Sequence, residues 1–550
     1  MPKVYDLLAD QLVQLGADTL FGVVGSGNFY IAEALRLRGV RFVAARHEAG
    51  ALAMADAWAR VTNRVGLCTV HMGPGFTNTL TPLVEAVKAR TPLLLLTAEV
   101  SRGAIHSNFA VDQEGIAAAA GAIPERLYTP ETALDDLYRA WRRALLERRP
   151  VVLLMPQDIQ TAIPQHVSPP SRAAFPAISS APDAETLARL ADILEQAHRP
   201  LILAGRGAVI SQARRELERL GDAIGALFAT TANAHGLFAG NPWNLGIAGG
   251  FSAPAAVEIM RQADLILAMG ASLTAWTRRH GKLFDPTATI VQVDVEPCAI
   301  GARYPVAVGC VGDVRTTASA LADLLTQAPA RQGWRTRELE KHVRHATWQD
   351  TPFEDKSTAD FVDPRTASKA LDELLPADRV LAIDSGHFMA YPIMYLKVPD
   401  ERAFVFTQAF QSIGLGLPTA IGAALACPDR VTIAAVGDGG LLMSLPELET
   451  VARLKLPLAV IVYNDSAYGA EVHHFAPMGH DTTTVTFPDV DFAALGRALG
   501  MTAYTVRSVA DLQALGQVLR DRERYPIVLD MKVNPTVRGD EWFDLAFQGH

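Results

Sequence analysis

The sequence predicts an α/β protein of three doubly wound parallel-sheet domains in series. At 550 residues the chain is too long for one hydrophobic core, and its length suggests several domains. Short runs rich in Val, Ile and Leu alternate with helical patterns along the whole chain. Because these runs are continuously apolar, they are typical of parallel strands that helices cover on both faces. Such sheets bind ligands at the carboxyl ends of their strands, so functional residues are expected there.

Two stretches read as linkers and divide the chain into three parts. The first is rich in Pro, Ser and Ala and runs from Ile163 to Ala184, and the second, from about Gln327 to Asp363, is polar and charged. The expected domains are therefore 1–165, 185–326 and 360–550. The strands are expected at FVAA, VGLCTV and PLLLLTAE in the first part, at PLILAG, LILAMG and TIVQVDV in the second, and at RVLAID, VTIAAVGD, PLAVIVYND and PIVLDMKV in the third.

Composition excludes several classes of protein. Hydrophobic residues make up 49% and charged residues 20% of the chain, which is typical of a folded globular protein. The net charge of −9 argues against nucleic acid or an anionic membrane as a partner. The N-terminal MPKVYDLLADQLVQLG reads as an amphipathic helix, not as a targeting signal, and no apolar run approaches the length of a membrane span. The four cysteines form no CxxC pair, so a cytoplasmic protein in a reducing compartment is expected.

Two strand-like runs of the third part each end on oxygen-bearing side chains. VTIAAV ends in Gly437-Asp438-Gly439, and LAVIVY ends in Asn464-Asp465. Because the carboxyl ends of adjacent parallel strands lie close together, Asp438 and Asp465 are expected to face a common site. Two such oxygens, a backbone carbonyl and phosphate oxygens together suit octahedral Mg²⁺.

A helix is expected soon after the GDG turn. Ser444 and Glu447 have the S-x-x-E spacing of a capping box, and Pro446 stands in the first turn. The two glycines let the backbone turn sharply and approach an anion. Taken alone, a GDG turn is equally compatible with an ordinary connection between a strand and a helix.

The GDG turn followed by YNDSAYG resembles the diphosphate- and magnesium-binding motif of thiamine-diphosphate-dependent enzymes. Further segments of the chain resemble the same family: FGVVGSG (Phe21 to Gly27), RHEAGALAMADAWAR (Arg46 to Arg60), VHMGPGFTN (Val70 to Asn78), TPLLLLTAE (Thr91 to Glu99) and QSIGLGLPTAIGAALA (Gln411 to Ala426). The resemblance covers the whole chain and implies a pyrimidine-binding, a central and a diphosphate-binding domain, in that order. The most similar branch contains the 2-oxo acid decarboxylases, the pyruvate oxidases and the acetohydroxyacid (acetolactate) synthases.

The resemblance implies thiamine diphosphate and Mg²⁺ as cofactors. Glu48 would hydrogen-bond the pyrimidine N1′ and favour the imino tautomer, whose 4′-nitrogen takes the C2 proton. Ile413 would prop the cofactor into a bent shape, although core packing explains this residue equally well. Asp438, Asp465 and the backbone carbonyl of Ala467 would hold Mg²⁺, and Asp465 is a departure because the family usually has Asn there. The other residues that the resemblance places on the cofactor are Gly25, His387, Gly437, Gly439, Gly440, Tyr468 and Gly469.

Three side chains are candidates for proton transfer to the reacting carbon. Ser26 and His71 fall where benzoylformate decarboxylases have an active-site Ser and His, and Glu471 falls where pyruvate decarboxylases have a glutamate. Each is equally compatible with a solvated loop residue. In this family a 2-oxo acid adds to the C2 ylide, loses CO₂ and leaves an enamine that is protonated or attacks a second carbonyl. The resemblance therefore implies a C–C lyase or carboligase that decarboxylates a 2-oxo acid.

Three other functions stay open at this point. They are an acetolactate-synthase-like carboligase, a 2-hydroxyacyl-CoA or hydroxyketone lyase, and an inactive paralogue with a structural or regulatory role, against which the retained Glu48 argues. PLILAGRGAV (Pro200 to Val209) resembles the position where relatives bind FAD or ADP, so FAD stays open as a second cofactor, although the full glycine fingerprint is missing. NFAVDQEG (Asn108 to Gly115) matches the usual synthase stretch only in part. TRRHGK (Thr277 to Lys282) is either a basic pocket for CoA phosphates or a solvated loop.

Glu48 and Asp438 lie in different expected domains. The resemblance implies a cofactor held between the pyrimidine domain of one subunit and the diphosphate domain of another, and hence a homodimer or homotetramer. The expected partner is a small 2-oxo acid, aldehyde or ketone. His473, His474 and His480 lack the spacing of a zinc site and are expected in a loop or lid along the substrate channel.

Overall fold

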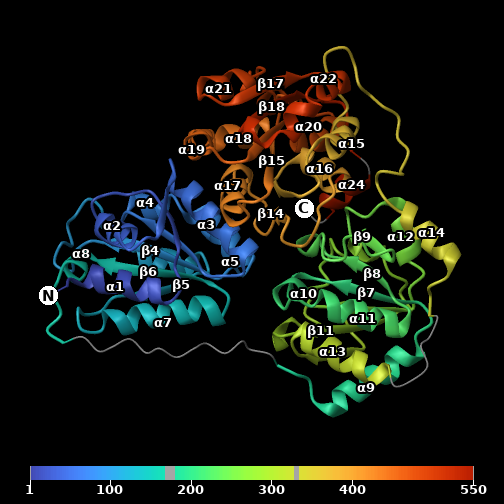
Figure 1. Ribbon diagram of the computed structural model, residues 1–550, viewed down its shortest axis with the longest axis horizontal. Coiled ribbons are helices and arrows are strands. Elements are labelled where there is room, and N and C mark those ends of the chain that lie inside the picture. Colours follow the sequence, from blue (N-terminus) through green and yellow to red (C-terminus); the bar gives the residue numbers. More distant parts are fainter. Residues whose placement is uncertain (1, 167–179, 327–332, 540, 549–550) are drawn as a thin grey trace.

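The computed structural model describes residues 2–166, 180–326, 333–539 and 541–548 and confirms three parallel α/β domains in series (Figure 1). Each domain contains a six-stranded sheet in which all paired strands are parallel. The strand orders are β2-β1-β3-β4-β6-β5, β12-β11-β10-β7-β8-β9 and β14-β13-β15-β16-β18-β17. Figure 1 shows the N-terminal domain in blue, the central domain in green and the C-terminal domain in orange and red.

The N-terminal sheet has helices on both faces. Its strands are β1 (Thr19–Gly22), β2 (Arg41–Ala44), β3 (Gly66–Val70), β4 (Leu93–Glu99), β5 (Ile123–Arg126) and β6 (Pro150–Pro156). Its helices are α1 (Val4–Gln14), α2 (Phe29–Leu37), α3 (Glu48–Thr62), α4 (Pro74–Thr77), α5 (Leu80–Lys88), α6 (Gln113–Ala119), α7 (Ala133–Leu146) and α8 (Gln157–Gln160). The amphipathic helix expected at the N-terminus is α1.

The central domain repeats this plan. Its strands are β7 (Pro200–Ala204), β8 (Leu227–Thr230), β9 (Asn244–Ile247), β10 (Leu265–Met269), β11 (Thr289–Asp294) and β12 (Val308–Val311). Its helices are α9 (Ala184–Gln196), α10 (Arg206–Ile210), α11 (Arg214–Ile224), α12 (Pro254–Met260), α13 (Val314–Leu325) and α14 (Arg337–His345).

The C-terminal domain carries the GDG turn and the chain's last helix. Its strands are β13 (Arg379–Ile383), β14 (Phe404–Phe406), β15 (Val431–Gly437), β16 (Leu458–Asn464), β17 (Thr502–Val506) and β18 (Ile527–Lys532). Its helices are α15 (Pro364–Leu374), α16 (Ala390–Tyr395), α17 (Gly416–Ala426), α18 (Asp438–Met443), α19 (Glu447–Leu454), α20 (Gly469–Phe475), α21 (Phe492–Ala498), α22 (Val509–Ala514), α23 (Gly516–Arg520) and α24 (Glu541–Ala546).

The apolar runs of the sequence form the inner strands of the three sheets. Every residue of β3, β7 and β13 is buried, as expected for strands covered on both faces. The edge strands β5, β9 and β12 are different, because buried and more exposed residues alternate along them. Polar residues interrupt any apolar run in β5 and β9, which explains why the sequence pattern did not single out these two strands.

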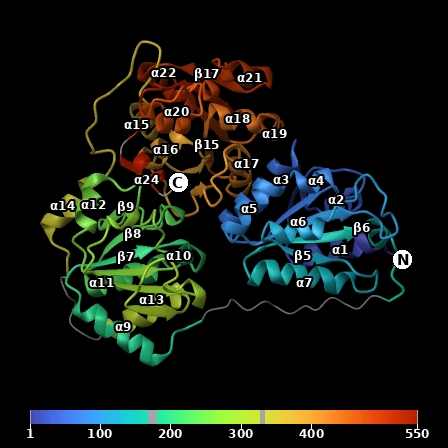
Figure 2. The same ribbon diagram turned by 180° about the vertical axis from the view of Figure 1, so that it is seen from behind.

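The C-terminal sheet contributes one face to each neighbouring domain. Val380 and Ala382 belong to a buried apolar cluster that continues into α3 and β3 of the N-terminal domain. Leu381 and Ile383, which point to the opposite face, belong to a cluster that continues into β7, β10 and α12 of the central domain. In both views α3 and α17 lie side by side across the first of these contacts (Figure 1 and Figure 2).

The second stretch interpreted as a linker is more than a connection. It contains α14, and Trp334, Val343 and Trp348 are buried in the apolar cluster shared by the central and C-terminal domains. Val362 pairs with Val533 next to β18. The polar residues of this stretch form an outer face, so composition alone hid its helix. Of the first linker, residues 167–179 lie outside the described residues, and α9 begins at its end.

The capping box expected at Ser444 and Glu447 is wrong. A helix begins earlier, at Asp438 itself, and Ser444 ends it. The next helix, α19, begins at Glu447 after Pro446 and has no side-chain cap. The carboxylate of Glu447 does not cap Ser444, because one oxygen binds the N-terminal domain and the other accepts the hydroxyl of Thr450 on α19 itself.

Candidate functional site

The carboxyl groups of Asp438 and Asp465 lie within hydrogen-bonding range of each other. Their strands β15 and β16 are neighbours, with Gly437 opposite Tyr463, so the residues that follow meet at the sheet edge. Burial raises the pKa of Asp438 to about 6, and the charge of Lys532 opposes this rise. Burial and then the negative charge of Asp438 raise the pKa of Asp465 well above its usual range. Two buried carboxyl groups in this arrangement are chemically suited to a divalent cation.

The turn after β16 directs Asp465 toward this pair. The Oδ1 atom of Asp465 accepts a hydrogen bond of 3.2 Å from the backbone N–H of Ala467, and Ser466 between them has a left-handed φ of 57°. A Cβ atom on Gly469 would lie 2.4 Å from the Oδ2 atom of Asp465, so glycine is required for this close approach. The turn therefore fixes the carboxylate beside the backbone of Ala467, the third expected metal ligand.

Asn464 has a different role from its neighbour Asp465. Its side-chain amide donates to Asp530 at 3.0 Å and to Asp489 at 3.2 Å, and its oxygen accepts the N–H of Ser466 at 3.1 Å. Asp530 is fully buried and pairs with the Lys532 ammonium at 2.9 Å. Asn464 is thus occupied in a polar network behind the strand ends, which leaves Asp465 as the side chain that faces Asp438.

A third buried acid, Asp384, follows the neighbouring strand β13. Both of its carboxylate oxygens accept the backbone N–H of Gly414, at 3.1 and 2.9 Å, and the N–H of Ser385 donates to it at 2.9 Å. Burial raises the pKa of Asp384 to about 6, although these N–H groups oppose the shift. Asp384 therefore holds the loop in which half-buried Ile413 precedes Gly414.

The GDG turn is packed too closely to accept side chains. A Cβ atom on Gly440 would lie 2.4 Å from the Oδ2 atom of Asp384, and one on Gly439 would lie 2.5 Å from the ring of Tyr468. Both glycines therefore bring the turn into contact with residues of neighbouring strand ends. Gly437, Gly439 and Gly440 thus lie at the turn that carries Asp438, and Tyr468 and Gly469 lie at the turn that carries Asp465.

The Ile413 loop is also held by the N-terminal domain. Glu85 on α5, which is 1% exposed, accepts the backbone N–H groups of Ala409 and Phe410 at 3.2 and 2.6 Å. The same carboxylate pairs with Arg60 of α3 at 2.9 Å. Two domains therefore fix the path of this loop. No motif in the sequence pointed to Glu85.

A second group of side chains surrounds Glu48 in the N-terminal domain. Glu48 is the first residue of α3, and the side-chain amide of Asn78 donates a hydrogen bond of 2.9 Å to its Oε2 atom. Gly75 lies beside the other oxygen, since a Cβ atom there would be 3.6 Å from Oε1. The charge of Glu48 also acts on the nearby His71. Glu48, His71, Gly75 and Asn78 thus form one cluster.

His71 has a defined tautomer in this cluster. The backbone N–H of Gly27 donates to its Nδ1 atom at 3.1 Å, and its ring contacts that of Phe109 edge to face at 4.9 Å. Burial lowers the pKa of His71, although the charge of Glu48 opposes the shift. Because Nδ1 accepts a hydrogen bond, the neutral ring carries its proton on Nε2. Gly25 packs against the same ring, whereas Ser26 is exposed.

These two groups remain separate within one chain. In the described parts of the chain, no hydrogen bond or ion pair joins Glu48 to Asp438 or Asp465. The structure thus brings together the expected residues of the N-terminal domain and, separately, those of the C-terminal domain.

His387 lies between the acidic pair and the last helix. A Cβ atom on Gly469 would lie 3.6 Å from the His387 Cβ atom, and the two rings of His387 and His473 are 4.2 Å apart. Burial and then the neighbouring His473 lower the pKa of His387 to about 3. The ring is therefore neutral, and its Nε2–H group donates to the carbonyl of Arg538.

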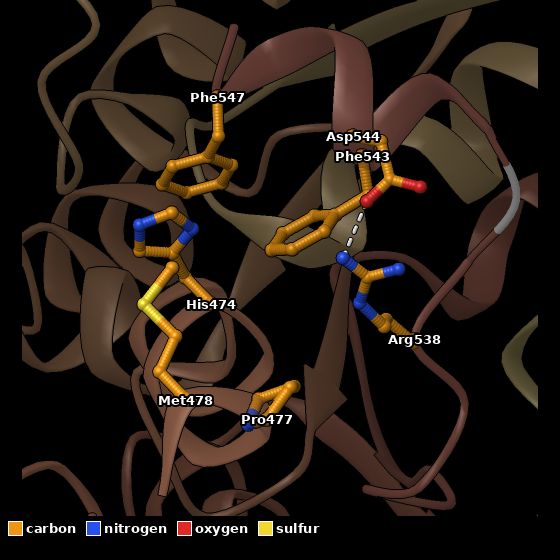
Figure 3. A pocket seen from close by; sticks show the side chains of 7 residues that line it. All are labelled: His474, Pro477, Met478, Arg538, Phe543, Asp544 and Phe547. Atoms are coloured by element: carbon orange, nitrogen blue, oxygen red, sulfur yellow. Dashed lines mark hydrogen bonds and ion pairs between the residues drawn. The ribbon is translucent and has the colours of Figure 1, made fainter. Parts of the chain in front are cut away.

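A pocket of about 290 Å³ opens between α20 and α24. Figure 3 shows its lining residues: His474, Pro477, Met478, Arg538, Phe543, Asp544 and Phe547. The ring of His474 stacks on that of Phe547 at 4.3 Å, and the Arg538 guanidinium pairs with the Asp544 carboxylate. Glu471 lies half-buried on α20. No group of three or more His, Cys, Asp or Glu side chains able to hold a metal occurs among the residues that the structure describes.

The two basic segments of the central domain pack in different ways. Gly205 and Gly207 of the GRGA turn pack against the backbone of Gly270. Burial and then the charge of Arg148 lower the pKa of Arg206 to about 9. In the TRRHGK loop, Arg278 stacks on Tyr304 at 4.1 Å, and the nearly buried Arg279 pairs with Glu541 of α24.

The described residues include no helix that is both long and apolar enough to cross a membrane.

Comparison with known proteins places this arrangement in one class of enzyme. Residues 2–119 match the N-terminal TPP binding domain of thiamine pyrophosphate enzymes, residues 187–321 match their central domain, and residues 384–531 match their C-terminal TPP binding domain. The chain belongs to the thiamine pyrophosphate (thiamine diphosphate) enzyme family. The matched descriptions name this cofactor and no flavin.

Several proteins with enzyme names resemble the chain over nearly its whole length. A probable 2-ketoarginine decarboxylase, AruI, of Pseudomonas aeruginosa is 31% identical, and the match covers 92% of this chain and 90% of that protein. A sulfoacetaldehyde acetyltransferase of Rhodobacter capsulatus is 28% identical over the same shares of both chains. The acetolactate synthase large subunit of Corynebacterium glutamicum is 26% identical, with 95% and 85% covered. The names of these relatives describe different reactions.

The sequence could have revealed Asp384 but gave no signal for Glu85. Asp384 ends the run RVLAID, and the strand-end rule that singled out Asp438 and Asp465 applies to it equally. Asn78 ends the quoted VHMGPGFTN segment, but its hydrogen bond to Glu48 depends on how two turns meet. Such contacts become visible only in the folded chain.

Proposed function

We propose that this protein is a thiamine-diphosphate- and Mg²⁺-dependent C–C lyase that decarboxylates a 2-oxo acid, with carboligation as a second capability. The observation that carries the proposal is the facing pair Asp438 and Asp465 at the strand ends of a TPP-binding domain. A retained Glu48 beside Asn78 in the other TPP-binding domain supports it.

The donor set fits a magnesium diphosphate. Asp438 and Asp465 supply two hard oxygens, and Ala467 adds a backbone carbonyl on the turn that holds Asp465. Two acids meet here among the residues that the structure describes, so the remaining ligands of an octahedral Mg²⁺ would come from the diphosphate and water. The buried like charges also fit a cation, because metal binding removes the repulsion that raises the pKa of Asp465.

When bound, thiamine diphosphate supplies a C2 carbon that can lose its proton and add to a carbonyl group. Glu48 would hold a proton at the pyrimidine N1′, and Asn78 would keep the Glu48 carboxylate oriented. Ile413 would press against the cofactor from a loop that Asp384 fixes. His387 has its Nε2–H occupied by Arg538, so only its Nδ1 atom is available to the cofactor.

Substrate protons would be moved by the side chains nearest the reacting carbon. His71 would donate from Nε2, since Gly27 fixes its tautomer and burial keeps the ring neutral. Glu471 on α20 and the exposed Ser26 would hold or relay protons beside it. These three roles rest on the family resemblance together with the positions of the side chains.

The complete site would form between two subunits. Glu48 and the acidic pair are separate within one chain, yet both belong to domains described as TPP-binding. A homodimer in which the N-terminal domain of one copy faces the C-terminal domain of the other would bring the halves together. A homotetramer would contain two such dimers.

The decisive experiment is a substrate panel. Purified protein with thiamine diphosphate and Mg²⁺ is incubated with 2-oxo acids of different size and charge, including pyruvate and 2-ketoarginine, while CO₂, aldehyde and acyloin are measured. Aldehyde without acyloin supports the decarboxylase. Formation of acetolactate from pyruvate supports an acetolactate-synthase-like carboligase. If none of the 2-oxo acids releases CO₂, the proposal is contradicted. That result favours a 2-hydroxyacyl-CoA or hydroxyketone lyase, or an inactive paralogue.

A further inference from the structure

Glu447 connects the segment after the GDG turn to the residues that precede Glu48. Its carboxylate is almost fully buried, with 1% of the residue exposed. The Oε1 atom accepts the backbone N–H groups of Arg46 and His47, both at 3.0 Å, and the hydroxyl of Thr450 donates to Oε2 at 2.7 Å. The contact joins residues 400 positions apart in the sequence.

The first turn of α3 is shaped around this carboxylate. A Cβ atom on Gly50 would lie 2.4 Å from the Glu447 Oε1 atom, so any larger side chain would displace one of the two. His47 caps α3 by accepting the N–H of Ala49 at 3.1 Å. Glu447 thus binds the peptide groups on one side of Glu48 while Gly50 makes room for it on the other.

The chemistry of Glu447 is unusual for a residue with only a packing role. Burial raises its pKa, although Thr450 and the N–H groups of Arg46 and His47 oppose the shift. A buried carboxyl group is costly to fold, and an apolar side chain of similar size would fill the same space at less cost. What an apolar residue could not do is bind two successive N–H groups and so fix the direction in which α3 starts.

We infer that Glu447 is a positioning residue that holds the Glu48 carboxylate in its proton-transfer orientation. The inference rests on the proposed function, which gives Glu48 the proton on the cofactor. Asn78 orients one oxygen of Glu48 from the side, and Glu447 fixes the backbone from which that side chain extends. The chain also supplies a matched surface carboxylate, Glu449, two positions further on.

Exchange of the cofactor C2 proton for deuterium tests this role without a substrate. Wild type, Glu447→Ala, Glu447→Gln and Glu449→Ala are loaded with thiamine diphosphate and Mg²⁺, and the exchange rate is followed by quenched proton NMR. Glu447→Ala is expected to slow exchange about 10- to 100-fold at saturating cofactor, since small misplacements of a catalytic group have effects of that size. Glu447→Gln keeps an oxygen for the two N–H groups and is expected to lose less.

Glu449→Ala is the control, because the Glu449 carboxylate binds the side chain of Arg46 at 2.5 Å and not the backbone. It should exchange at the wild-type rate. Equal slowing by Glu449→Ala, or wild-type exchange in Glu447→Ala, would overturn the positioning role. Calorimetry should show that Glu447→Ala and Glu449→Ala bind the cofactor with an affinity within a few-fold of that of the wild type. A large loss of affinity in Glu447→Ala alone would also overturn the positioning role.

Gly50→Ala provides a second variant should Glu447→Ala fail to fold. The added Cβ atom displaces the Glu447 carboxylate while alanine favours the helix, so the fold should be retained and exchange slowed. Wild-type exchange in a folded Gly50→Ala protein would contradict the inference. The same measurement distinguishes a failure of the proposed function. If the wild-type protein exchanges the C2 proton no faster than free thiamine diphosphate does, the proton-transfer role of Glu48 itself is wrong. If the wild type exchanges this proton quickly but decarboxylates no 2-oxo acid, only the substrate assignment is wrong.

Discussion

Asp438 and Asp465 face each other across adjacent strand ends, and the charge of Lys532 only partly offsets the rise in the pKa of Asp438. Replacing Asp465 by Asn removes a buried carboxyl group whose ionisation burial and Asp438 oppose. We therefore expect Asp465→Asn to stabilise the metal-free protein by on the order of 1 kcal/mol. We also expect the Asp465→Asn protein to retain Mg²⁺ binding, because the amide oxygen of the new side chain can replace the carboxylate oxygen. Asp465→Ala has no oxygen at this position and loses that ligand.

Thermal unfolding in EDTA and in Mg²⁺ with thiamine diphosphate measures both effects. The increment produced by the ligands should shrink in Asp465→Asn and nearly vanish in Asp465→Ala. A lower melting temperature of Asp465→Asn in EDTA would show that the acidic pair does not repel as its geometry indicates. Asn464→Ala should destabilise both forms alike, because Asn464 bonds to Asp530 and Asp489 and not to the expected metal site.

A site shared between subunits has a signature in mixed proteins. Glu48→Gln and Asp438→Asn should each lack activity while keeping the wild-type far-ultraviolet circular dichroism spectrum. Unfolding and refolding the two variants together produces hybrid dimers in which one site has an intact Glu48 and an intact Asp438. Random pairing should therefore restore about one quarter of wild-type activity.

The individually refolded variants are the control for this mixture. If the site forms within one chain, every hybrid site carries a defect and the mixture stays inactive. That outcome would contradict the shared site while leaving the roles of Glu48 and Asp438 in place.

Asp384 should make stability depend on pH. Burial raises its pKa to about 6 from the usual 3.8, so the folded protein binds this proton more tightly than the unfolded chain does. Its contribution to stability is therefore fully present below about pH 3.8 and is lost as the pH rises through about 6. As the pH rises between these limits, the free energy of unfolding of the wild type should fall by on the order of 2 kcal/mol relative to that of Asp384→Asn.

Urea unfolding of both proteins at several pH values from 4 to 7 gives this difference directly. Comparing the two proteins cancels the titration of other acids, provided that they behave alike in both. A difference that stays constant with pH would mean that Asp384 ionises normally in the fold.

The tautomer of His71 can be tested by replacing each nitrogen separately. In His71→Asn the side-chain oxygen can still accept the N–H of Gly27, but the Nε2 donor is lost. We expect a folded protein whose kcat on its 2-oxo acid falls by about 10²- to 10⁴-fold, the usual contribution of a general acid. His71→Gln, whose amide reaches the Nε2 position, should lose less kcat, and equal losses in both variants would argue against donation from Nε2.

The sequence allowed the fold to be predicted because the inner strands are buried on both faces. Runs such as VGLCTV and PLAVIVYND have no alternating polar residues, and a parallel sheet is the structure that such runs form. The edge strands β5 and β9 lacked this signal, since one side of each is more exposed. Likewise, the polar face of α14 concealed a helix in a stretch that composition marked as a linker.

The candidate site could be predicted wherever its residues lie at strand ends or in family motifs. Asp438 and Asp465 were expected to meet, and they do. Glu447 shows the limit, because its spacing from Ser444 fits a local cap, yet its carboxylate bonds to backbone groups 400 positions away. A local pattern cannot predict a competing partner in another domain.

The alternation of the C-terminal strands between two apolar clusters has a consequence for recombining this protein with its relatives. Val380 and Leu381 belong to different interdomain cores. Each neighbouring domain therefore buries one face of its sheet in a core of its own and the other face in a core that it shares with the C-terminal domain. A chimera that exchanges the C-terminal domain at its sequence boundaries would replace one wall of both remaining domains at once. A chimera that folds would have to include the residues of α3 and β7 that face the transplanted sheet. The segment that can be exchanged as a unit is therefore larger than the C-terminal domain.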